Sequence, residues 1–163
     1  MVLWLVACAT TTTTTAASTS ATEATTTTTG STIATPTGEL PDLPTTSISI
    51  AGVDLQVWMA DDAAERNQGL RQVESLPADI DGMLFVWDEP TETAFVMEDT
   101  LVPLDVWFFD EEGELVGSHE MTPCTTDPCS LYPTPGPVSW ALETPQGGQE
   151  FEIGDRLSTS ELG

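Results

Sequence analysis

The residues most able to do chemistry lie between Arg66 and Asp105. Asp105 opens a strongly apolar run, where a buried carboxylate needs a partner to offset its desolvation. Arg66 is the natural partner to propose, because the chain has three Arg and no Lys. We expect Asp105 to accept backbone N–H bonds at a bend or to pair with Arg66. A role in binding or catalysis is the other interpretation.

Two carboxylates, Asp99 and Asp105, also allow an acid/base pair as in glycosidases, where the distance between the carboxyl groups decides the mechanism. The sequence does not give this distance, and it contains no GxSxG, HExxH or P-loop motif. We therefore predict a non-enzymatic binding or accessory domain, with a carboxylate-dependent hydrolase of envelope carbohydrate as the alternative. No catalytic residue, metal ligand or cofactor is assigned. The candidate binding residues are Arg66, Met97, Asp99, Thr100 and Asp105.

Cys124 and Cys129 stand in the segment PCTTDPC. In an exported protein such a pair is best explained as a disulfide. A metal site would need further Cys or His ligands, and a redox couple usually has the spacing C-x-x-C. His119, the only His, could form a nucleophilic pair only with a free Cys nearby. We expect His119 to be an ordinary strand residue.

The charge balance limits the kinds of partner. The chain has 27 acidic and 3 basic residues, a net charge of -24, so it cannot neutralise a run of phosphates and nucleic acid is not expected as a partner. Such acidity suits either a high-salt habitat, where charge repulsion is screened, or simply an acidic protein outside the cytoplasm.

The N-terminal part predicts an anchor and a tether. The residues LVAC, ending at Cys8, match the lipobox of bacterial lipoproteins, so residues 1–8 are interpreted as the remnant of a lipoprotein signal with Cys8 acylated. Residues 9–46 are rich in Thr, Ser and Pro and predict a disordered linker. The protein would then be extracytoplasmic and held to the cell membrane by lipid, with secretion as the alternative. A small ligand or an envelope protein is the expected partner.

Residues 47–160 predict one compact, mainly β domain of sandwich or barrel type. A hairpin over Ser47–Met59 precedes a short helix that is capped by Asp61 or Asp62 and stops at Gly69. The further strands expected are Met83–Trp87 with Thr93–Met97 as its partner, a buried Asp105–Phe109, Glu114–Met121, Val138–Glu143, Gln149–Ile153 and Arg156–Thr159, with a loop over Thr122–Pro137.

A series of motifs carries a family resemblance. It comprises Arg66, Gly69-Leu70, GMLF at 82–85, Phe95, Met97, Thr100, PLD at 103–105 and Leu142-Glu143. In this order and spacing the chain resembles the domain of unknown function 192 family over about residues 48–157, as a lipoprotein-like member. The resemblance implies a single β-rich domain, often secreted or lipid-anchored, whose biochemical role is not established. Glu98 stands where the family usually has Lys, so no anion-binding role is expected at this position.

Overall fold

The structure is a computed structural model, and it describes residues 43–159. Cys8 and nearly all of the predicted linker lie outside these residues. The described part is mainly β with one short helix, as the sequence predicts. No helix within it is long and apolar enough to cross a membrane. The elements are β1 (Thr45–Ile50), β2 (Val53–Ala60), α1 (Ala63–Gln68), β3 (Gly82–Thr91), β4 (Ala94–Val96), β5 (Leu104–Phe109), β6 (Leu115–Met121), β7 (Leu131–Pro133), β8 (Val138–Pro145) and β9 (Leu157–Thr159).

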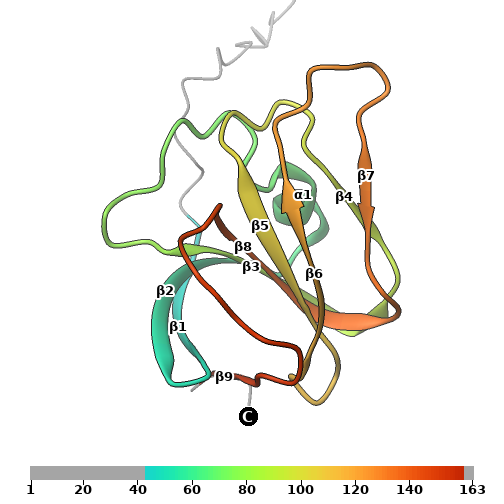
Figure 1. Cartoon of the computed structure of the whole chain (residues 1–163). Coiled ribbons are helices and arrows are strands. Elements are labelled where there is room, and N and C mark those ends of the chain that lie inside the picture. The colour runs from blue at the N-terminus through green and yellow to red at the C-terminus, as the bar shows by residue number, and fades with distance from the viewer. Residues whose placement is uncertain (1–42, 160–163) are drawn as a thin grey trace, which may run out of the picture. The chain divides into compact units, whose positions relative to one another are not determined.

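Seven strands form one sheet in the order β6-β5-β8-β3-β2-β1-β9, which curls into a half-barrel (Figure 1). Strands β2 and β3 are parallel, and each other neighbouring pair is antiparallel. A parallel pair needs a crossover connection, and here the connection contains α1. Strands β4 and β7 form a separate two-stranded sheet.

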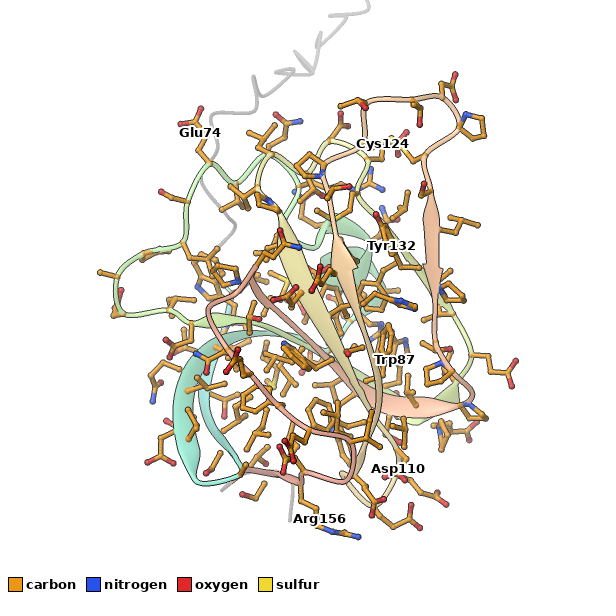
Figure 2. The ribbon with its side chains drawn as sticks, in the orientation of Figure 1. Glu74, Trp87, Asp110, Cys124, Tyr132 and Arg156 are labelled. Atoms are coloured by element: carbon orange, nitrogen blue, oxygen red, sulfur yellow. A yellow bond between two sulfur atoms is a disulfide. The ribbon has the colours of Figure 1, made fainter. Side chains whose placement is uncertain are left out.

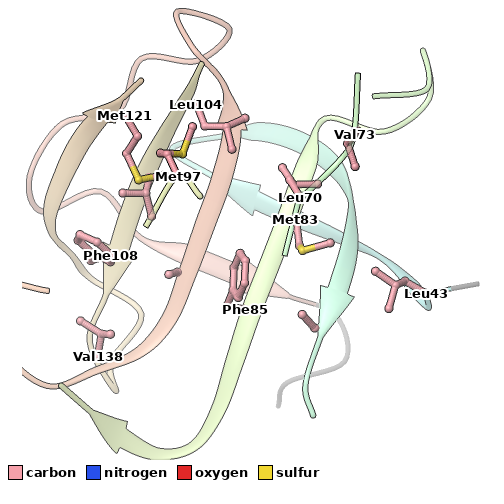
Figure 3. Close-up of a cluster of buried hydrophobic side chains, with 13 residues drawn as sticks. Leu43, Leu70, Val73, Met83, Phe85, Met97, Leu104, Phe108, Met121 and Val138 are labelled. Atoms are coloured by element: carbon pink, nitrogen blue, oxygen red, sulfur yellow. The ribbon is translucent and has the colours of Figure 1, made fainter. Parts of the chain in front are cut away.

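Alternating side chains on the central strands build two hydrophobic clusters, because successive residues of a strand point to opposite faces. On β3 and β5, Phe85 and Phe108 belong to one cluster, whereas Leu84 and Phe109 belong to the other. We call the first the helix-side cluster, since it includes Leu70 just after α1 (Figure 3). The second is the opposite-side cluster. The sheet therefore has an apolar layer on both faces.

Strand β5 is the most deeply buried element. All six of its residues are buried, as expected for a strand held between β6 and β8. One of its polar side chains is bonded by a neighbouring strand: Trp107 Nε1 donates a hydrogen bond of 3.1 Å to Thr144 Oγ1 on β8. This confirms the prediction that Asp105–Phe109 is the most buried strand.

Local side-chain bonds explain why α1 starts and stops where it does. Asp62 Oδ1 accepts hydrogen bonds from the backbone N–H groups of Ala64 (2.7 Å) and Glu65 (2.8 Å), and Glu65 Oε2 accepts one from Asp62 N at 3.2 Å. This reciprocal capping box satisfies N–H groups that a helix start leaves unpaired. The helix ends at Gly69, whose φ of 50° favours glycine. The predicted helix is confirmed.

The expected pairing of Thr93–Met97 with β3 is wrong. Strand β3 pairs with β2 along Gly82–Phe85 on one side and with β8 on the other, and neither partner is the Thr93–Met97 segment. Strand β4 pairs instead with β7, with Phe95 opposite Tyr132. Strand β7 lies inside the stretch that the sequence predicts to be a loop. Three residues, one of them Pro133, carry no usable periodicity, so the sequence pattern does not reveal this strand.

The predicted strand Gln149–Ile153 is also wrong. Glu152 and Asp155 close a local turn there: Glu152 N donates to Asp155 Oδ2 at 2.8 Å, and Asp155 N donates to Glu152 O at 2.9 Å. An Asp side chain that bonds nearby backbone offers the chain an alternative to a sheet ladder. Phe151 still packs against the opposite-side cluster.

The two Cys residues and His119 lie near the two-stranded sheet. The Sγ atoms of Cys124 and Cys129 are 2.11 Å apart and their Cα atoms 5.6 Å apart, so the geometry allows the predicted disulfide. His119 lies within β6, where its Nε2 is 2.9 Å from Pro133 O on β7. The geometry favours a disulfide and a structural His over a nucleophilic Cys–His pair.

Candidate ligand pocket

A cavity of about 260 Å³ lies between α1, β3 and β4. We call it the aromatic pocket, because three aromatic side chains form much of its wall. Its lining residues are Arg66, Asn67, Gln68, Gly69, Leu70, Arg71, Phe85, Trp87, Thr93, Ala94, Phe95, Val96, Thr100 and Glu143. Pockets that bind small molecules typically combine such apolar walls with a few convergent polar groups.

The aromatic wall comes from two strands. Phe85 and Trp87 are two apart on β3 and face the same side, with ring centroids 6.4 Å apart and an angle of 20° between the planes. Phe95 on β4 meets both rings edge-on, with ring centroids 5.1 Å from Phe85 and 6.5 Å from Trp87. Offset and edge-to-face contacts are the favourable arrangements of aromatic rings, so this wall is held in place before any ligand binds.

Glu143 is the one carboxyl group in the lining of the aromatic pocket. It lies on β8, where its sheet neighbours are Met83 on β3 and Val106 on β5, and its exposed fraction is only 6%. Neither of the ion pairs within the described residues involves it. Burial raises the pKa of Glu143 to about 8, because a low-dielectric environment disfavours the charged form. At pH 7 this carboxyl group is therefore mostly protonated.

Arg66 stands over the aromatic wall. Its guanidinium carbon is 5.8 Å from the ring centroid of Trp87, a cation–π contact. Its Nη1 donates to Asp61 O and, at 2.8 Å, to Val86 O. The predicted pairing of Arg66 with Asp105 is wrong, because α1 places Arg66 beside the middle of β3, where the guanidinium bonds the backbone carbonyls of Val86 and Asp61.

The described residues contain two ion pairs. Arg71 pairs with Glu98 at 3.2 Å beside the aromatic pocket, and Arg156 pairs with Glu114 at 2.9 Å. Arg156 lies at the other end of the described part from Cys124 (Figure 2). Arg66 belongs to neither pair. Although the chain has 27 acidic residues, one of its three cations thus has no ion-pair partner within residues 43–159.

The structure separates the five predicted binding residues. Thr100 joins Arg66 in the lining of the aromatic pocket. Asp99, with φ of 57°, lines a different cavity beside the Cys124–Cys129 loop. Met97 is 1% exposed and packs in the helix-side cluster. Only Arg66 and Thr100 share a site.

Asp105 lies on the other face of the sheet. Its Oδ2 accepts a hydrogen bond from Gly147 N at 2.8 Å, and its Oδ1 is buried without a partner among the described residues. The backbone bond was one of the two structural roles expected for this residue. Asp99 and Asp105 line separate cavities, so they do not form the acid/base pair that the hydrolase alternative needs. Within residues 43–159 no three His, Cys, Asp or Glu side chains group as metal ligands would.

Sequence reasoning missed Glu143 as a site residue. A signal for Glu143 was present. The segment VSWALE has an acid at the end of a run of buried strand residues, in register with Ala141 on the helix-side face. A lone carboxyl group in such a position is a candidate functional group.

Known structures share this fold. A candidate transcription regulator from Sinorhizobium meliloti 1021 is 27% identical, with a TM-score of 0.65 over 75% of this chain and 98% of that one. A protein of unknown function from Novosphingobium aromaticivorans is 23% identical, with a TM-score of 0.61 over 71% of this chain and 86% of that one. No curated protein matches the chain.

The sequence itself gives the family. Residues 46–159 match domain of unknown function 192, described as an uncharacterized ACR. The match spans both sheets and every residue of the aromatic pocket. The chain belongs to the domain of unknown function 192 family.

Proposed function

We propose that this protein is a non-enzymatic binding domain that takes a small organic ligand in the aromatic pocket. The observation that carries this proposal is Glu143, a buried acid that lines the aromatic pocket and has no ion-pair partner among the described residues. A buried polar group without a hydrogen bond costs stability. A ligand that pairs with this group would remove the cost, and perturbed acids in clefts are typical of functional sites.

A binding role is better supported than the hydrolase alternative. Glycosidases use two carboxyl groups, whereas Glu143 is the one carboxyl group in the lining of the aromatic pocket. Asp99 and Asp105 line other cavities. The description of the Sinorhizobium neighbour suggests regulation of transcription. Direct contact with DNA does not suit this chain, because its net charge is -24.

We place the binding domain outside the cytoplasm, held to the cell membrane by a lipid on Cys8. The support is the LVAC segment and the Thr-rich stretch that follows it. The closeness of Cys124 and Cys129 adds to it, since disulfides persist in oxidising compartments. The partners are then the membrane, through the lipid, and a small ligand; an envelope protein is the other expected partner.

Thermal unfolding of the full chain with a panel of sugars, amino acids, amines and organic acids tests the binding role. A ligand at 100 times its dissociation constant stabilises a protein by about 2.7 kcal/mol, which raises the melting temperature by several degrees. The shift should shrink in Glu143→Gln and persist in Glu114→Gln, the same change in the distant ion pair. A flat response to every class would contradict the proposal.

Labelling of cells with a fatty-acid analogue tests the anchor. The protein should take up the label and fractionate with membranes, and Cys8→Ser should abolish both. Protein that takes up no label, or membrane binding that persists in Cys8→Ser, would contradict the lipid anchor. Neither result would affect the proposal of ligand binding in the aromatic pocket.

A further inference from the structure

The aromatic pocket holds one positive and one acidic group that lack charged partners. Among the described residues, Arg66 and Glu143 take part in neither ion pair. Arg71 also lines the pocket, but Glu98 offsets its charge at 3.2 Å. Arg66 is positive and Glu143 becomes negative when it ionises, so a ligand with a single charge would pair with only one of them.

Arg66 has hydrogen-bonding capacity left for a ligand. A guanidinium group carries five N–H donors in a planar fork. Nη1 bonds the carbonyls of Asp61 and Val86, whereas Nε and Nη2 have no acceptor among the described residues. The edge formed by these two nitrogens matches a carboxylate, which Arg binds in a bidentate manner.

Glu143 offers the complementary chemistry. Once ionised, a carboxylate among aromatic rings is a strong partner for an ammonium group, because ring faces also attract cations. The contact of the Arg66 guanidinium with Trp87 shows that this aromatic wall accepts a cation. The apolar surfaces of Phe85 and Phe95 remain for a hydrocarbon group of the ligand.

We propose that the ligand is a small zwitterion with an apolar group, of the class of the hydrophobic α-amino acids. Its ammonium group faces Glu143, its carboxylate faces Arg66, and its side group lies on the aromatic wall. The cavity of about 260 Å³ suits this size, since pockets for drug-sized ligands begin at about 300 Å³. The inference rests on the proposed function and specifies its ligand.

A proton balance follows from this arrangement. The groups around Glu143 that carry charge are Arg66 and Arg71, and its neighbours on β3 and β5 are Met83 and Val106. Burial raises the pKa of Glu143 to about 8, so an ammonium group that binds near pH 7 displaces a proton from this carboxyl group to the buffer. Affinity should therefore rise from pH 6 to pH 8 and then level off.

Calorimetry with three related compounds tests the ligand class on the full chain. L-phenylalanine carries both charges, its amide lacks the carboxylate, and its N-acetyl derivative lacks the ammonium group. L-phenylalanine should bind at least about tenfold more tightly than either derivative, since each loses one charged hydrogen-bonded contact. Near pH 7, comparison of buffers with different ionisation enthalpies should show the release of close to one proton.

Two variants with matched controls assign the groups. Glu143→Gln should remove the proton release and the preference for L-phenylalanine over the N-acetyl derivative. Arg66→Gln should remove the preference over the amide. Glu114→Gln and Arg156→Gln, the same changes in the distant ion pair, should leave both preferences intact. For each variant, the ratio of its affinities for two ligands is compared. A general destabilisation of the fold would weaken the binding of both ligands and would leave this ratio unchanged.

Two results separate the zwitterion from the binding role. If another class of the thermal panel binds in a Glu143-dependent way and the amino acid series does not, the ligand class is overturned and the binding role stands. If L-phenylalanine and its N-acetyl derivative bind equally well, the ligand class is likewise overturned and the binding role stands. If no compound of either set binds, the proposed function itself fails.

Discussion

Glu143 makes the stability of the protein depend on pH in an unusual direction. Its pKa is raised from the ordinary 4.5 to about 8 by burial. Between these values the folded state keeps a proton that the unfolded state has released, so the free energy of unfolding falls as pH rises. The loss is about 1.4 kcal/mol per pH unit at most, and it ends above pH 8, where both states are ionised.

Glu143→Gln should remove this dependence. Relative to the unchanged protein, the variant should gain roughly 3 kcal/mol of stability between pH 5.5 and pH 8, because the amide does not ionise. Urea unfolding at several pH values measures the difference, which cancels the effect of the other carboxylates. Glu114→Gln serves as the control, since its carboxyl group is half-exposed and paired with Arg156. A constant difference across the range would show that Glu143 is ionised in the folded protein.

At this scale the sequence predicts residue types better than residue partners. Asp105 and Arg66 were rightly singled out as a buried acid and a scarce cation, yet they bond Gly147 and the carbonyls of Asp61 and Val86. Which face of a sheet each group occupies depends on how the strands pair. Asp105 on β5 pairs with Thr144 on β8, the residue after Glu143. The two acids therefore point to opposite faces of the sheet, and only the register reveals that Glu143 faces the aromatic pocket.

Strands β3 and β8 approach each other closely beside Glu143. A Cβ atom added at Gly82, the first residue of the GMLF motif, would lie 2.1 Å from the backbone oxygen of Glu143. Any side chain there would push the two strands apart. This contact explains why the motif begins with glycine, and it ties the motif to the pocket residue that sequence reasoning missed.

Gly82→Ala should therefore destabilise the protein by about 1–3 kcal/mol, the usual cost of overpacking a close contact. It should also weaken ligand binding, because β8 carries Glu143. Gly136→Ala is the matched control, since a Cβ atom there has no neighbour within 4 Å. Urea unfolding compares the two variants. Equal stabilities would mean that β3 and β8 are not held this closely.

At the scale of elements, local sequence patterns predict most of the strands and the helix, but they do not predict which strands pair with each other. The alternation of β2 and the Asp62 cap are properties of a few neighbouring residues, and both predictions are confirmed. The partner of β4 is β7, which lies more than 30 positions further along the chain. Such long-range pairing brings Phe95 to the aromatic wall, so the pocket could not be assembled from the sequence.

The whole molecule carries a net charge of -24, and like charges repel one another more in the compact state than in the extended one. Salt shortens the range of this repulsion, from about 10 Å at 0.1 M to about 3 Å at 1 M. The charge balance thus links stability to the ionic strength of the medium.

Unfolding by urea at increasing NaCl concentration should show this link. The free energy of unfolding should rise with salt concentration. The rise should be steepest below about 1 M, because charge screening is largely complete once that concentration is reached. Urea is the suitable denaturant, since it carries no charge of its own. KCl should act like NaCl if screening is the cause. A free energy of unfolding that is unchanged or lower in salt would show that repulsion between the acidic residues does not destabilise the folded state.

The pairing of β1 with β9 has a consequence for the connectivity of the domain. Ile48 lies opposite Thr159 and Ile50 opposite Leu157 in an antiparallel pair, so the start of β1 and the end of β9 lie at the same end of this pair. A short bridging peptide could therefore join the two strands, and new ends could be opened at the Gly136 turn. Because its first and last strands are paired, the domain is suited to circular permutation and to insertion into a loop of a host protein.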